Sequence, residues 1–144
     1  MSDENAMQDD RLVQERILAY RQLEERMDAL VRQQASFASK VAEINSTLGA
    51  IDEIAAGRGD AMVPLGTAVY AKGALDTGTK LIVEVGSDVA VERTPADAKL
   101  ILEARRKDLE QAVEVLQKDI QMVALMLQGI ENEVQAMARS RGPQ

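Results

Sequence analysis

The chain has 144 residues, enough for one ordinary domain, and carries a formal net charge of −7 at pH 7. Because 46% of its residues are apolar but only 2% are aromatic, we expect aliphatic side chains stacked along a narrow seam, not a round core built on aromatic rings. Cysteine and histidine are absent, which excludes disulfides and thiolate metal sites and removes the commonest general base and metal ligand, so no catalysis, cofactor or metal is expected.

Residues 1–57 are predicted to form one long helix of a coiled coil. Apolar residues alternate three and four positions apart, a period of about 3.5, which makes a helix supercoil with a partner. Gln34 interrupts the middle of this seam, where a polar group typically fixes the register. Gly57 follows the last periodic residues and marks the expected end of the helix. The seam positions are Val13, Arg16, Tyr20, Leu23, Met27, Leu30, Gln34, Phe37, Val41, Ile44, Leu48 and Ile51.

Residues 58–94 are predicted to form two successive β-hairpins, because valine-rich runs with a period near two alternate with turn sequences. The expected strands are residues 62–65, 68–75, 80–86 and 89–93. On the third strand, Leu81, Val83 and Val85 are expected to share one face. Four short strands leave unpaired edges, so strands from other chains are expected to complete a barrel or stacked sheets. The predicted oligomerisation residues are Val63, Leu65, Val69, Leu75, Leu81, Val83, Val85, Val89 and Val91.

A second long helix is predicted for residues 95–138, followed by a flexible tail at 139–144. Thr94 is the expected N-cap and Pro95 the first helical residue, with the Asp97 carboxylate near the positive end of the helix dipole. The seam positions are Leu102, Arg106, Leu109, Val113, Leu116, Ile120, Val123, Leu127, Ile130, Val134 and Met137. The predicted fold class is therefore mainly α: a long antiparallel coiled-coil hairpin with two central β-hairpins that join an intersubunit β-barrel. Both termini would then lie together at a free tip.

Apolar residues near the two termini exceed what the seam requires, and five of the seven methionines fall there. Unbranched thioether side chains adapt to irregular apolar partners, which suits a promiscuous binding surface. The predicted residues of this distal binding surface are Leu12, Val13, Ile17, Leu18, Met122, Met126, Leu127, Ile130, Val134 and Met137. In the alternative interpretation, residues such as Leu12 and Met122 only broaden the seam between the helices.

The central segment resembles the α class of prefoldin subunits, in particular those of archaea. The resemblance lies in Val63-Pro64-Leu65-Gly66, in the run Tyr-Ala-Lys-Gly-Ala-Leu at residues 70–75, and in the Val-Gly and Val-Ala-Val sequences at 85–86 and 89–91. The order of helix, two hairpins and helix extends it over nearly the whole chain. It implies an ATP-independent chaperone subunit that assembles with prefoldin β subunits as an α2β4 hexamer. It also implies that the arm tips capture unfolded polypeptides and deliver them to a group II chaperonin.

Other classes of function fit the sequence less well. A structural coiled-coil scaffold or spacer is the alternative that shares every argument about the fold. An enzyme is not expected, because neighbouring carboxylates such as Glu24 and Glu25 diverge on a helix and no phosphate-binding loop is present. The acidic balance disfavours nucleic acid as a partner. With no apolar stretch of membrane-spanning length and an acidic start, the chain is expected to avoid membranes and to be cytoplasmic.

Overall fold

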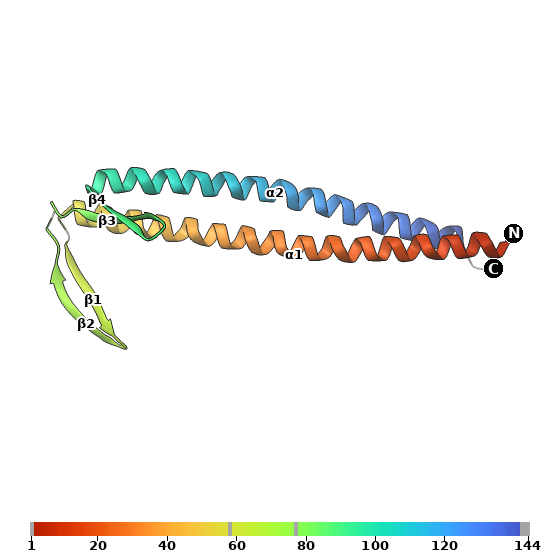
Figure 1. Cartoon of the computed structure of the whole chain (residues 1–144), viewed down its shortest axis with the longest axis horizontal. Helices are drawn as coiled ribbons and strands as arrows, with labels where there is room; N and C mark the ends of the chain where they lie inside the picture. Colours follow the sequence, from red (N-terminus) through yellow and green to blue (C-terminus); the bar gives the residue numbers. More distant parts are fainter. Residues whose placement is uncertain (1, 58, 77, 142–144) are drawn as a thin grey trace. The chain divides into compact units, whose positions relative to one another are not determined.

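The computed structural model describes residues 2–57, 59–76 and 78–141. In it the chain forms two long α-helices separated by four β-strands (Figure 1). The elements in order are α1 (Ser2–Ala55), β1 (Asp60–Gly66), β2 (Val69–Ala74), β3 (Leu81–Gly86), β4 (Val89–Arg93) and α2 (Pro95–Ser140). The chain divides into two compact units. The first, here called the terminal unit, contains residues 1–37 and 112–144, and the second, the hairpin unit, contains residues 38–111. The predicted fold class is confirmed as mainly α with two long helices and two β-hairpins.

In the terminal unit, α1 and α2 run antiparallel along the predicted seam. Arg141 Nη2 lies 3.0 Å from Asp10 Oδ1, whereas further along α1 the side-chain amide of Gln34 donates to Gln117 Oε1 at 2.8 Å. Residue numbers on α2 fall as those on α1 rise, so the two helices are antiparallel. The N-terminal end of α1 therefore lies beside the C-terminal end of α2. Every apolar seam residue of the unit is buried or half-buried. The heptad prediction is therefore confirmed, and Gln34, its polar interruption, has a polar partner across the seam.

The helix ends of the hairpin unit follow local capping chemistry. At the end of α1, Gly57 has a φ of 85°, in the left-handed region that favours glycine, and its N–H donates to the Ile54 carbonyl at 3.1 Å. At the start of α2, the Asp97 N–H donates to Thr94 Oγ1 at 3.2 Å, which confirms Thr94 as the N-cap. The second helix continues through Ser140, two residues beyond the predicted end. Residues 142–144 of the predicted tail lie outside the described residues.

The first hairpin pairs β1 with β2 antiparallel, from Asp60 opposite Ala74 to Gly66 opposite Val69. The predicted second strand, 68–75, was too long at both ends. Ala68 has a φ of 59° and belongs to the turn, and the N–H of Leu75 donates to the Gly59 carbonyl at 2.7 Å beyond the end of the strand. A side chain at Gly59 would collide with the Leu75 carbonyl, so glycine is required at the end of the hairpin opposite its turn.

The second hairpin pairs β3 with β4 and packs on the two helices of the hairpin unit. Val83 is buried against Ile51 of α1 and Ala98 of α2, and Leu81 and Val91 pack around them. The predicted shared face is confirmed at Leu81 and Val83 but is wrong at Val85, which is 46% exposed. The register shifts between Glu84 and Gly86, and such a bulge redirects the strand.

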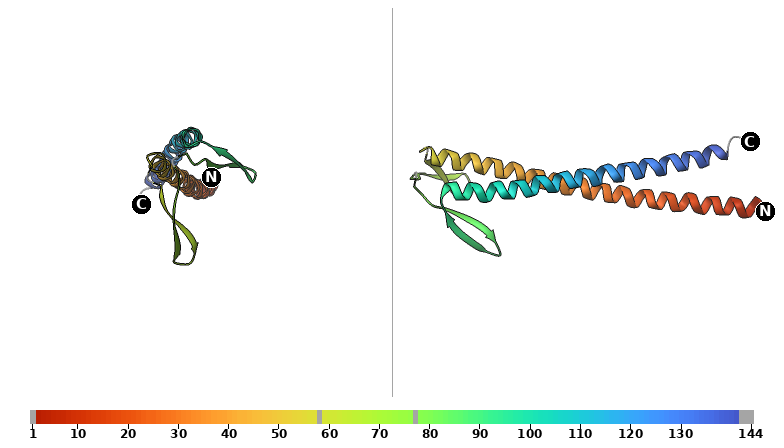
Figure 2. Two further views of the ribbon diagram at one scale, coloured as in Figure 1. Left: turned by 90° about the vertical axis from the view of Figure 1, so that its left-hand side faces the viewer. Right: turned by 90° about the horizontal axis from the view of Figure 1, so that it is seen from above.

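The two hairpins form separate two-stranded sheets. Viewed along the helices, they project in different directions within the hairpin unit (Figure 2, left). Almost every residue of the β1–β2 hairpin is exposed on both faces. An isolated two-stranded hairpin is marginally stable in water, so this hairpin requires covering by another surface.

Candidate functional site

Large apolar side chains are exposed on both helices of the terminal unit. Leu18 on α1 is 58% exposed and Leu125 on α2 is 73% exposed, although neither is needed for the seam. Six of these side chains are here called the terminal patch, and Met7, Val31 and Val115, which are also exposed, are not counted in it. The patch consists of Leu12, Ile17, Leu18, Met122, Leu125 and Met126. These six side chains are distributed over both helices, and because exposed large apolar side chains mark interaction sites, the patch is a candidate binding surface.

The other predicted residues of the distal surface lie in the seam. Val13, Leu127, Val134 and Met137 are half-buried, and Ile130 is only 9% exposed. These five side chains pack between α1 and α2, so they are less exposed than the residues of the patch. Leu125, which lies off the seam rows in sequence as Met122 and Met126 do but is not in the predicted set, is the most exposed member of the patch. Val31 and Val115, also exposed and off the seam, were not predicted.

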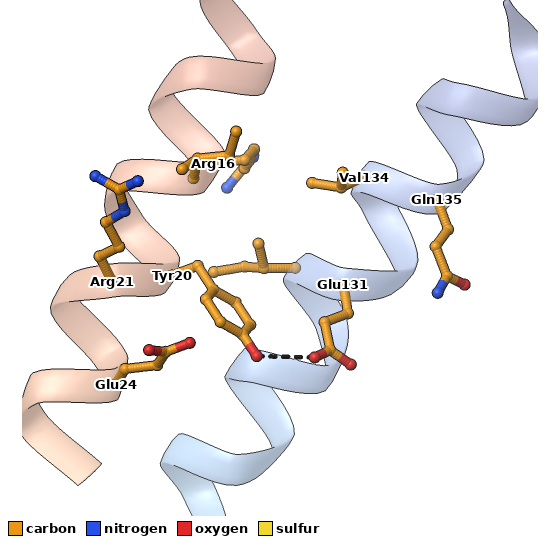
Figure 3. A pocket seen from close by; sticks show the side chains of 9 residues that line it. Arg16, Tyr20, Arg21, Glu24, Glu131, Val134 and Gln135 are labelled. Carbon is orange, nitrogen blue, oxygen red and sulfur yellow. Dashed lines mark hydrogen bonds between the residues drawn. The ribbon is translucent and has the colours of Figure 1, made fainter. Parts of the chain in front are cut away.

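An open groove runs along one flank of the seam beside the patch (Figure 3). It has a volume of about 580 Å³, within the range of about 300–1,000 Å³ typical of ligand sites. Ile17, Ile130 and Val134 supply its apolar lining, and Arg16, Tyr20, Arg21, Glu24, Glu131 and Gln135 supply its polar lining. An apolar side chain of a ligand could enter such a groove while its backbone contacts the polar lining.

Polar contacts join α1 and α2 at this groove. The Tyr20 hydroxyl donates to Glu131 Oε1 at 2.8 Å, as Figure 3 shows, and Arg16 Nε lies 3.0 Å from Glu133 Oε2. The hydrogen bond to the Glu131 carboxylate raises the pKa of Tyr20 above its ordinary value, and desolvation and the charges of Glu131 and Glu24 act in the same direction. A tyrosine is neutral at physiological pH without any shift, and the raised pKa extends to higher pH the range over which the Tyr20 hydroxyl can donate.

The hairpin unit exposes a second apolar set. The exposed members of the predicted oligomerisation residues are Val63, Leu65, Val69, Leu75, Val85 and Val89. Tyr70 and Ile82 are also exposed, at 57% and 72%, and were not in that prediction. In contrast, Val83 is buried and Leu81 and Val91 are half-buried against the chain's own helices. These three stabilise the hairpin unit itself.

Chemistry-bearing clusters are few in the part of the chain that the structure describes. Within residues 2–57, 59–76 and 78–141, no group of three or more acidic side chains could hold a metal ion. Over the same residues, neither long helix has an apolar run that could cross a membrane. The arrangement described above offers apolar contact surface, which suits binding.

Known proteins resemble the chain in both sequence and fold. Residues 23–140 match the family described as "Prefoldin subunit". The chain is 29% identical over 132 residues to "Prefoldin subunit alpha" of Archaeoglobus fulgidus, covering 90% of this chain and 96% of that protein. It is 28% identical over 97 residues to the protein of the same name from Thermofilum pendens, covering 65% and 74%. Filamentous PFD from Methanocaldococcus jannaschii shares the fold, with a TM-score of 0.66 and 18% identity over 83% of this chain and 98% of that one.

Proposed function

Because the chain belongs to the prefoldin family, whose members are chaperone subunits, we propose that it is an ATP-independent holdase that captures unfolded polypeptides on its terminal patch. A polypeptide captured in this way is a client of the chaperone. The observation that carries this proposal is the exposure of six large apolar side chains around a seam that is already filled without them. Exposed apolar surface binds the apolar segments that an unfolded chain displays.

The composition of the patch supports binding of many different sequences. Two of its six members, Met122 and Met126, are flexible and polarisable thioethers, and the others are aliphatic. The patch contains no aromatic anchor that would demand one complementary pocket. Adaptable surfaces of this kind favour breadth over specificity.

Prefoldin subunits assemble with one another, and we propose that this chain joins β-class subunits in an α2β4 hexamer through its hairpins. The β1–β2 hairpin supports this proposal because both of its faces are exposed and each edge strand offers unpaired backbone groups. Closure with strands of other subunits into a β-barrel would cover Leu65, Tyr70 and Ile82.

Delivery of clients to a group II chaperonin and a cytoplasmic location belong to the same proposal and rest on family membership alone. A solved structure of the same fold is described as filamentous, so the stoichiometry needs a direct check. If the chain forms the proposed α2β4 hexamer, it should co-purify with about two β-class subunits for each copy of itself. A filament of this chain by itself would contradict it.

Client capture is tested by suppression of aggregation of a chemically denatured protein. The assembled complex should suppress aggregation without nucleotide. A variant carrying Ile17→Ser, Leu18→Ser and Leu125→Ser should require about five- to tenfold more complex for the same effect, since it removes apolar contact area. Its helix content should not change, because these side chains lie outside the seam.

The matched control places serine at Val31 and Val115, which are also exposed on α1 and α2 but lie outside the patch. This control should hold clients as the parent chain does. The structural spacer is the rival function, and it is favoured if the parent complex fails to suppress aggregation at all.

A further inference from the structure

We propose that Met122 and Met126 form an oxidation site by which hydroperoxides switch off client holding at the terminal patch. The inference rests on the proposed holdase function and adds to it a chemical control. It concerns α2 in the terminal unit, on the flank of the seam that carries Met122 and Met126, away from the groove of Figure 3.

The two thioethers are placed for attack by a dissolved oxidant. Met122 is 55% exposed and Met126 is 49% exposed. They are four positions apart along α2, so their side chains are neighbours on the same face of the helix. Two other methionines, Met27 and Met137, are half-buried in the seam. The chain contains no cysteine, so its only sulfur atoms are thioethers.

A small groove of about 130 Å³ lies between these methionines and α1. Leu23 and Val123 form its apolar part, and Arg26 and Asp119 its charged part. Among the described residues, the Arg26 guanidinium has no hydrogen bond or ion pair to another side chain. The Arg26 guanidinium therefore lines the same groove as the two methionines, whose thioether sulfurs are only weak acceptors.

The chemistry is an oxygen-atom transfer. A lone pair of the thioether sulfur attacks one oxygen of hydrogen peroxide, the O–O bond breaks, and the departing oxygen takes the proton of the transferred one and leaves as water. The sulfur is oxidised by two electrons to a sulfoxide and the peroxide is reduced by two. The new sulfoxide oxygen is a strong acceptor, which Arg26 can satisfy from α1.

Oxidation would convert the methionine part of the patch from apolar to polar. A client segment then loses two flexible apolar contacts and must displace water from two sulfoxide dipoles. We expect client affinity to fall by about five- to tenfold, and methionine sulfoxide reductases to restore it, because this modification is reversible.

The test uses the assembled complex treated with hydrogen peroxide and then freed of oxidant. Peptide mass spectrometry should show Met122 and Met126 oxidised ahead of Met27, and suppression of aggregation should fall by the stated factor. Incubation with the two methionine sulfoxide reductases should return it.

The matched control is the double variant Met122→Leu and Met126→Leu, which keeps apolar volume but cannot be oxidised. In complex with the same partner subunits, its holding of clients should not change on peroxide treatment when compared with its own untreated sample. Equal loss of holding in this variant would place the effect at other residues, such as the exposed Met7, and would overturn the inference.

A second variant, Met122→Gln with Met126→Gln, imitates the polar product and should hold clients weakly without any oxidant. Full holding by this variant would also overturn the inference. If the untreated parent complex holds no client, the proposed function itself fails, an outcome that is distinct from holding that peroxide does not change.

Discussion

Polar side chains within the seam of the terminal unit each have a polar partner on the opposite helix. Tyr20, Gln34 and Arg16 occupy seam positions of α1, and all three reach a hydrogen-bonding or charged group of α2 at 2.8 to 3.0 Å. A polar group left unpaired beside apolar neighbours would cost free energy, whereas a paired one favours a single register. These contacts contribute more to alignment than to stability, because exposed ion pairs contribute little.

The Tyr20–Glu131 hydrogen bond predicts a measurable pH dependence. The pKa of Tyr20 is raised in the folded chain, so the stabilisation is fully present below the unfolded value of about 10 and is lost as pH rises through the folded value. Phenolate absorbance in a Tyr70→Phe background reports Tyr20 alone, since the chain has two tyrosines. Adding Glu131→Gln should lower the midpoint. An unchanged midpoint would show that the carboxylate does not hold the phenol.

Among the elements, the two hairpins differ in what stabilises them. The β3–β4 hairpin is anchored through Val83 to Ile51 and Ala98, and Arg105 Nη2 donates to the Glu84 carbonyl at 2.5 Å. Contacts of this kind are absent along the described strands β1 and β2, where only Ala61 and Ala71 are even half-buried. The second hairpin thus belongs to the core of the hairpin unit, whereas the first is exposed.

The anchoring of β3 through Val83 predicts effects of different size for two neighbouring residues on this strand. Val83→Ala should lower the free energy of unfolding by about 1–2 kcal/mol, because it removes buried methyl groups and leaves a cavity. Ile82→Ala is the matched control, since Ile82 is 72% exposed in the single chain, and it should change that free energy by less than about 0.5 kcal/mol. Urea unfolding monitored by circular dichroism measures both. Equal losses would contradict the assigned anchoring.

For the whole molecule, both units expose more large apolar side chains than a solitary solvated chain normally does. Leu65, Tyr70 and Ile82 in the hairpin unit are each more than half exposed, as are Leu18 and Leu125 in the terminal unit. The first group would be covered by other subunits under the proposed assembly. The second group is left for clients under the proposed function.

Loss of the hairpin surface should therefore abolish assembly without unfolding the helices. A Leu65→Ser and Tyr70→Ser variant should fail to co-purify a β-class partner, because hairpin contacts lose their apolar area on both faces. The Val31→Ser and Val115→Ser chain should assemble as the parent does. Co-purification and sedimentation velocity measure the outcome, and a variant that still binds its partner would place the interface elsewhere.

Local patterns determined the helical parts of this protein. The 3.5-residue period predicted two rows of seam residues on each helix, and every apolar member of these rows is buried or half-buried in the structure. Gly57 and Thr94 marked the end of α1 and the start of α2. Such features depend on residues a few positions apart. They can therefore be read without knowledge of contacts distant in sequence.

Only the tertiary structure decided which apolar residues remain exposed. Val83 and Val85 are two positions apart on β3, and the alternating pattern predicts the same face for both. Val83 packs on Ile51, whereas Val85 is exposed at a bulge. Ile130 is in the predicted binding set but is only 9% exposed between α1 and α2, whereas Leu125, outside that set, is 73% exposed. Burial is set by segments far apart along the chain, and a periodic pattern carries no information about which of them will meet.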